Sequence, residues 1–116
     1  MAEPTYREKV DAQRIMAIRQ MNRELPPACE EFIRAIAVTT GTFTRLAYTL
    51  DLRTFFHFLQ AERVAFTDKP LYAFTDADLA AVSQNDLTAY VEYLTLYYRE
   101  TDSDEDRPLK PVVNHE

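Results

Sequence analysis

A dense group of polar residues precedes the central helical pattern of the chain. It consists of four threonines and two arginines: Thr39, Thr40, Thr42, Thr44, Arg45 and Arg53. The start of a helix presents free backbone N–H groups and the positive end of the helix dipole, both of which favour anions. Hydroxyl and guanidinium groups at such a start could form a phosphate clamp. The residues support equally a second interpretation, in which Thr44 only caps the helix and the other hydroxyls fill a loop.

The remaining reactive side chains do not form a catalytic set. His57 lies between two phenylalanines and has no metal-ligating residue three or four positions away, and His115 lies among the last residues. Cys29 falls on an apolar helical stripe, which favours a buried, inert thiol. The alternating acids after residue 100 lack the glycine and the glutamate of a calcium loop. We therefore expect no enzyme complete within this chain, no metal site and no cofactor.

The composition limits the chain to one domain with few tight turns. It has 116 residues, 47% of them hydrophobic, and a single glycine, which excludes a glycine-rich phosphate loop and makes an all-β fold improbable. The single cysteine excludes an internal disulfide and favours a reducing compartment. The first residues lack the apolar run of a signal peptide, and no stretch approaches the roughly 18 apolar residues of a membrane span. We expect a cytoplasmic protein without membrane contact.

The net charge of −6 is unevenly distributed. Residues 1–60 hold eight bases and seven acids, a net of +1, whereas residues 61–116 hold five bases and twelve acids, a net of −7. Five of those acids lie in the run from Glu100 to Asp106. The half that carries the threonines and arginines is nearly neutral, so the overall acidity does not exclude nucleic acid as its partner.

The first half of the chain has the pattern of three helices. The first covers residues 4–24 and is either loosely held or docked on a neighbour. Pro26-Pro27 opens the second, which is expected to end near residues 38–40 with a left-handed C-cap at Gly41. The third begins after Thr44 as its N-cap, and its apolar residues cover so wide an arc that it is expected at the centre of the core.

The second half is irregular over residues 64–77, with a short helix expected from Asp76 to Val82. Ser83 to Asp86 has the pattern of a capping box, and a regular apolar stripe then predicts a helix from Leu87 to Tyr98. Residues 100–116 are acidic, contain two prolines and have no periodicity, which predicts a flexible tail. The expected fold class is all-α.

Two segments resemble the N-terminal core-binding domain of tyrosine recombinases, the phage-integrase family. The first, TFTRLAYTLDLRTFFHFL, matches the family pattern at Thr44, Tyr48, Asp51, Leu52, Phe55, Phe58 and Leu59. The second, LAAVSQNDLTAYVEYL, follows about 35 residues later and matches at Leu79, Val82, Ser83, Asp86, Leu87, Tyr90 and Leu94. The resemblance covers residues 28–98 and implies a SAM-like bundle of about four helices.

The resemblance implies a module that clamps duplex DNA at the core site of a recombinase, for integration or excision. By position, Thr42, Thr44 and Arg45 become the first expected DNA contacts, Arg53 the next, and Thr40 belongs to the same site. The resemblance also implies that four residues of the first segment form core: Tyr48, Leu52, Phe55 and Leu59.

The resemblance divides the chain into an N-terminal helical extension (1–25), a core-binding domain (26–99) and a linker (100–116). The family's catalytic Arg, His-x-x-Arg and Tyr belong to a further domain, and its last core-binding helix follows the segment that ends here at Tyr98. We expect a fragment cut before that helix, with apolar surface exposed on the helix from Leu87 to Tyr98. Other recombinase protomers would be partners of the full-length protein.

A helical protein-interaction module without DNA binding is the alternative. Its support is the net acidity of the chain, the acidic tail and a tyrosine-rich helix that could dock a partner.

Overall fold

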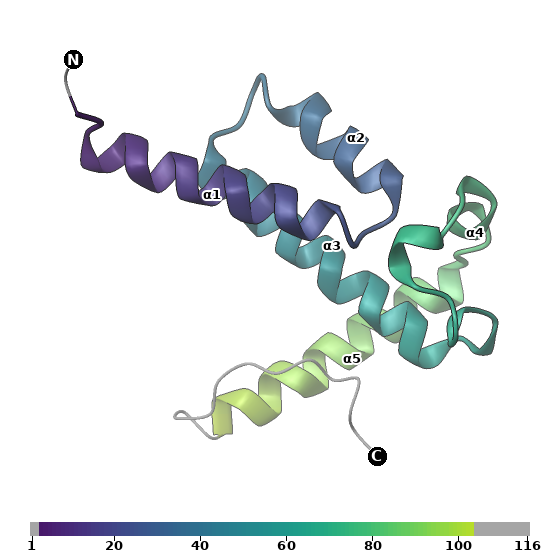
Figure 1. Ribbon diagram of the computed structural model, residues 1–116. Helices are drawn as coiled ribbons and strands as arrows, with labels where there is room; N and C mark the ends of the chain where they lie inside the picture. Colours follow the sequence, from purple (N-terminus) through teal and green to yellow (C-terminus); the bar gives the residue numbers. More distant parts are fainter. Residues whose placement is uncertain (1–2, 104–116) are drawn as a thin grey trace.

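The computed structural model describes residues 3–103, and the side chains of residues 3–96. Five α-helices follow one another along the chain (Figure 1): α1 (Tyr6–Asn22), α2 (Pro27–Ile36), α3 (Thr42–Glu62), α4 (Asp76–Ala80) and α5 (Gln84–Ser103). Two short 3₁₀ helices, η1 (Val64–Phe66) and η2 (Leu71–Ala73), connect α3 to α4. The described residues contain no strand, and the all-α prediction is confirmed.

The first three helices begin near the predicted places, but local signals differ from the expected ones. Thr5 and Glu8 form a capping box at the start of α1: the Glu8 N–H donates to Thr5 Oγ1 at 3.1 Å, and the Thr5 N–H donates to the Glu8 carboxylate at 2.9 Å. This Thr-x-x-Glu pattern is a sequence signal for the start of α1. Pro27 opens α2, as predicted.

The connection between α2 and α3 corrects two predictions. α3 begins at Thr42 with Gly41 as its N-cap, so Thr44 lies inside the first turn and the prediction that it caps the helix is wrong. Gly41 has φ −88° and ψ 176°, which is extended, so the predicted left-handed C-cap is also wrong. The hydroxyls of Thr39 and Thr40 donate to the Ile36 carbonyl, at 3.4 and 2.6 Å. In a left-handed C-cap, backbone N–H groups would donate to the last carbonyls of the helix, and here these hydroxyls do so at the end of α2.

The N-terminal helix is docked on the central one. α1 lies along the first half of α3, while the first turn of α1 projects beyond it (Figure 1). Ile18 is buried, and the guanidinium of Arg14 lies 5.3 Å from the centre of the Phe43 ring. Segment 4–24 is therefore held by α3.

The core surrounds the C-terminal half of α3. Its buried members come from α3 and from the segments on either side: Leu25, Cys29, Phe56, Phe58, Leu59, Phe66, Leu71 and Phe74. The irregular segment after α3 is a structural part of this core, because Phe74 packs against the rings of Phe56 and Phe66 at 5.8 and 4.8 Å. Leu59 is completely buried and Leu52 and Phe55 are partly buried, whereas Tyr48 is 43% exposed, so the expectation that it is core is wrong.

The predicted capping box fixes the start of α5. The Ser83 N–H donates to the Asp86 carboxylate at 2.8 Å, and the Asp86 N–H donates to Ser83 Oγ at 3.2 Å. Arg63, at the end of α3, donates to the same carboxylate at 2.5 Å. The Ser83 backbone hydrogen bond and then Arg63 hold the pKa of Asp86 below its usual range, although burial opposes them. One carboxylate therefore joins α3 to α5.

The described part of α5 is longer than predicted. It continues to Ser103, so the expected tail is helical over residues 100–103, and residues 104–116 lie outside the described part of the chain. α4 covers Asp76–Ala80, two residues shorter than expected, and a second capping box between Thr75 and Asp78 starts it.

We expect Leu59→Ala to lower the free energy of unfolding by about 2–5 kcal/mol, because it removes buried methyl groups and leaves a cavity at the centre of the core. Urea denaturation followed by circular dichroism measures this change. The matched control is Val64→Ala at an exposed position, with an expected change below about 0.5 kcal/mol. Equal effects of the two substitutions would contradict the placement of the core.

Stability should depend on pH through Asp86. Its folded pKa is lowered, so the ionised carboxylate stabilises the fold above the unfolded value of about 3.9, and this contribution is lost as the pH falls through the lowered folded value. We expect the melting temperature to fall as the pH drops below about 4, the unfolded pKa of an aspartate, and Asp86→Asn to remove part of that fall. Thermal melts across this range test it, with the exposed Asp68→Asn as control. If both variants had the same pH profile, the stabilising role of the Asp86 carboxylate between α3 and α5 would be refuted.

Candidate nucleic-acid interface

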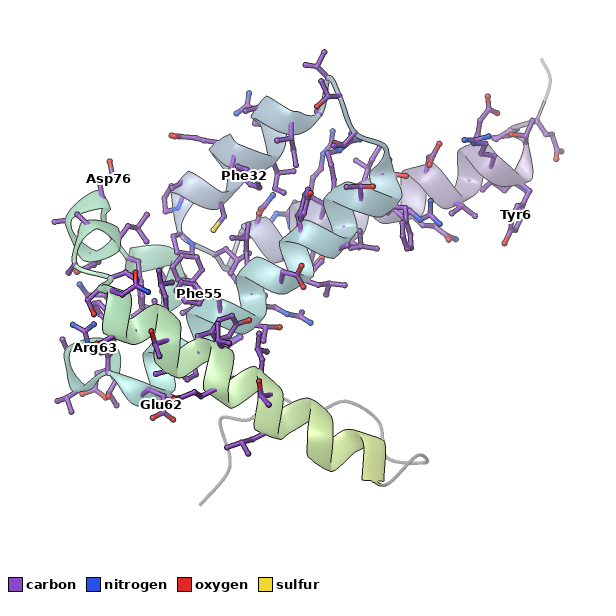
Figure 2. All side chains as sticks on the ribbon, turned by 180° about the vertical axis from the view of Figure 1, so that it is seen from behind. Tyr6, Phe32, Phe55, Glu62, Arg63 and Asp76 are labelled. Carbon is purple, nitrogen blue, oxygen red and sulfur yellow. The ribbon has the colours of Figure 1, made fainter. Side chains whose placement is uncertain are left out.

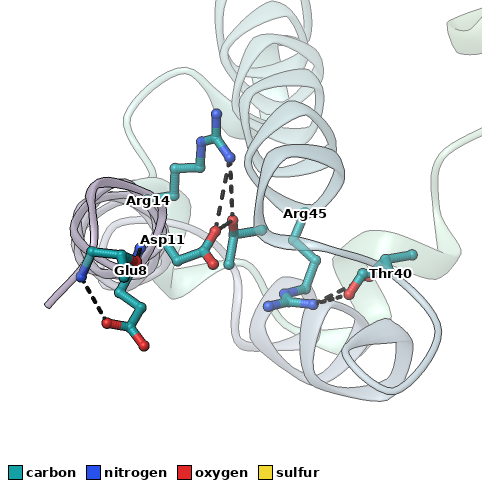
Figure 3. A network of polar contacts seen from close by, with 7 residues as sticks. Glu8, Asp11, Arg14, Thr40 and Arg45 are labelled. Atoms are coloured by element: carbon teal, nitrogen blue, oxygen red, sulfur yellow. Dashed lines mark hydrogen bonds and ion pairs between the residues drawn. The ribbon is translucent and has the colours of Figure 1, made fainter.

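Two of the expected DNA contacts are bound within the α2–α3 connection (Figure 3). The Arg45 guanidinium donates to the carbonyl of Thr40, to that of Ala37 at 3.2 Å, and to Thr40 Oγ1 at 3.4 Å. The Thr40 hydroxyl itself donates to the Ile36 carbonyl. Arg45 therefore satisfies carbonyls that the end of α2 leaves without partners, which is a structural use of its charge.

A third expected contact, Thr42, is buried between α1 and α3. Thr42 is only 9% exposed, and its hydroxyl donates to the Asp11 carboxylate at 2.5 Å. Arg14 lies 3.5 Å from that hydroxyl and 3.9 Å from the carboxylate, so the three side chains form one polar contact between the helices (Figure 3). A phosphate could reach Thr42 only if α1 moved.

Thr44 and Arg53 are the two expected contacts that remain without a polar partner among the described residues. Nine residues separate them, so they lie about 180° apart around α3. Arg53 is exposed and lines a shallow groove between α1 and α3, together with Met16, Gln20 and Leu50. The five predicted residues therefore do not converge on one phosphate: three are used internally and two face opposite directions.

The N-terminal helix carries basic side chains that are absent from the predicted site. Lys9, Arg19 and Arg23 are exposed and make no ion pair with a described residue. On a helix of 3.6 residues per turn they fall within an arc of about 80°, and they span about 21 Å along the axis. The signal was present in the spacing, but the apolar stripe of α1 is too weak to show which side faces outward.

A second surface is an open groove of about 480 Å³ between α2, α3 and α5. Its lining is mostly apolar: Phe32, Tyr48, Asp51, Leu52, Thr54, Phe55, Tyr90 and Leu94. The rings of Phe32 and Tyr48 lie 6.1 Å apart and both are nearly half exposed. Leu87 and Val91 of α5 are 44% and 61% exposed, which confirms the prediction of exposed apolar surface on this helix.

The thiol of Cys29 is buried in the core. Burial raises the pKa of the Cys29 thiol to about 11, so the reactive thiolate is rare at neutral pH. His57 is partly buried on α3. Within the described part of the chain, no three His, Cys, Asp or Glu side chains gather where they could hold a metal ion.

None of the helices described has the length and apolar character needed to cross a membrane.

Comparison with known proteins leaves the family of the chain open. No protein-family model matches it, and neither does any curated protein or solved structure.

We expect Thr42→Val to lower the free energy of unfolding by about 1 kcal/mol, because it keeps the shape of the side chain but removes the hydrogen bond to Asp11. Amide hydrogen exchange in α1 should become faster. Thr44→Ala is the control and should change stability by less than about 0.5 kcal/mol, because Thr44 is not the N-cap. A larger effect at Thr44 than at Thr42 would contradict this account of the start of α3.

Proposed function

We propose that this chain is a DNA-binding module of the integrase core-binding type, which contacts duplex DNA in the cytoplasm while a separate catalytic domain carries out integration or excision. Other recombinase protomers are its partners in the complete assembly. The observation that carries the proposal is that Lys9 and Arg19 of α1, Arg23 at its C-cap and Arg53 of α3 are exposed and make no ion pair with a described residue.

Contacts between the two resembling segments support this proposal. Tyr90 of the second segment packs against Phe55 and Phe58 of the first, with ring centres 5.0 and 5.2 Å apart. The side chains that carry the resemblance thus include those that join α3 to α5.

The positive side of α1 supports phosphate binding. Duplex DNA carries one negative charge per about 1.7 Å of its axis, so a row of bases about 21 Å long can reach several phosphates. Arg53 adds an exposed cation on α3, in the groove that α3 forms with α1. In this proposal Arg53 keeps its expected role as a DNA contact, whereas Thr40, Thr42 and Arg45 hold the α2–α3 connection and α1 in position.

Fluorescence anisotropy with a labelled duplex tests the proposal. We expect Arg19→Ala with Arg23→Ala to weaken binding about tenfold at about 50 mM salt, and Arg53→Ala about threefold. Each lost phosphate contact should reduce the slope of log affinity against log salt by about 0.9.

The matched control is Arg34→Ala, which removes an exposed arginine of α2 outside this surface. An equal loss of affinity for Arg34→Ala and Arg53→Ala would show only a general charge effect. Binding that does not weaken between about 50 and 200 mM salt would exclude phosphate contacts altogether.

A helical protein-interaction module is the second candidate function. The groove between α2, α3 and α5 presents apolar side chains to solvent, and Leu87 and Val91 of α5 are exposed as well. Apolar surface of this kind on a soluble domain is typical of protein contacts.

A further inference from the structure

We propose that the groove between α2, α3 and α5 binds an amphipathic helix of a partner protein whose apolar side carries a lysine or arginine. This inference rests on the second candidate function and specifies its partner. It is independent of the DNA-binding surface on α1.

The shape of the groove suits a helix. α5 crosses the end of α3 and then diverges from it, so the groove opens to solvent between them (Figure 1). Figure 2 shows Phe55 between the two helices, and Leu52, Tyr90 and Leu94 line the same groove. Grooves of this kind bind the apolar face of a helix through side chains spaced three or four residues apart.

Charge selects the class of helix. Asp51 is exposed, lines the groove and makes no ion pair with any residue that the structure describes, and no lysine or arginine is among the lining residues. A fully apolar helix would remove water from this carboxylate without replacing its partners, and an acidic helix would repel it. A single cation on the apolar side of the helix satisfies it.

The aromatic side chains beside Asp51 favour the same ligand. Phe32 and Tyr48 expose much of their rings within the groove. A guanidinium or ammonium group near Asp51 could lie over one of these ring faces, where the quadrupole of the ring attracts a cation. The carboxylate and the rings together therefore form a site for a cationic side chain with apolar neighbours. The same carboxylate disfavours phosphate, so DNA is not expected here.

A tryptophan-bearing peptide is a direct probe, because the chain contains no tryptophan. The probe is an amphipathic leucine–lysine helix with one tryptophan on its apolar side, and its comparison is the same peptide with glutamate in place of lysine. We expect tryptophan emission to report binding of the lysine peptide, with amide shifts at Asp51, Phe55 and Leu94. Asp51→Asn should weaken that binding about fivefold or more. Asp68→Asn, which removes an exposed carboxylate outside the groove, should leave it unchanged.

The outcomes distinguish two claims: that the groove binds a helix of a partner protein, and that this helix carries a cation on its apolar side. If the glutamate peptide binds the groove as tightly as the lysine peptide, the charge assignment is overturned while the interaction function stands. If neither peptide shifts groove residues, both are overturned. If Asp51→Asn and Asp68→Asn weaken binding of the lysine peptide equally, the peptide responds to the net charge of the protein and not to Asp51, and the proposal is overturned. Groove shifts that depend on protein concentration alone identify a second copy as the occupant and also overturn it.

Discussion

The width of the apolar surface on α3 is the constraint on which the rest of the structure depends. Buried residues appear on α3 from Thr42 to Leu59, and they face more than one direction. No single neighbouring helix can cover so wide an arc. α1 covers the first half of α3, and η1, η2 and the start of α5 cover the second half (Figure 1). α2 contacts both halves, because Phe32 lies beside Tyr48 and Cys29 belongs to the core around Phe56 and Leu59. The bundle is therefore arranged around α3, and Leu25 and Cys29 from before α3 share one core with Phe66, Leu71 and Phe74 from after it.

Signals within a few residues of one another were readable from the sequence. Pro27 marks the start of α2, and Ser83 with Asp86 marks the start of α5, because each pattern satisfies backbone groups of its own helix. The start of α3 could not be located this way. Thr42 is fixed by Asp11, which lies 31 residues earlier in the chain, and no local pattern reveals a partner at that distance.

The candidate site shows the same limit for charged residues. Arg45 follows the start of a helix, where an arginine is a reasonable phosphate ligand, yet its donors serve the carbonyls of Ala37 and Thr40. Whether a guanidinium is free depends on how the preceding helix ends, which is a property of the folded connection. Arg53 could be predicted to be available because it lies within a long regular helix, away from any such end.

α5 is packed against the bundle in its first half and projects from it in its last turns. Asp86, Tyr90 and Tyr93 in its first half contact α3 and the residue that follows α3, while the helix axis of its last turns extends away from α3 (Figure 1). The ten residues that follow Tyr93 in α5 are about 15 Å long, so a tilt of about 10° after Tyr93 displaces the end of the helix by about 3 Å. The packing of Tyr90 and Tyr93 on α3 therefore sets the direction in which the last turns of α5 point.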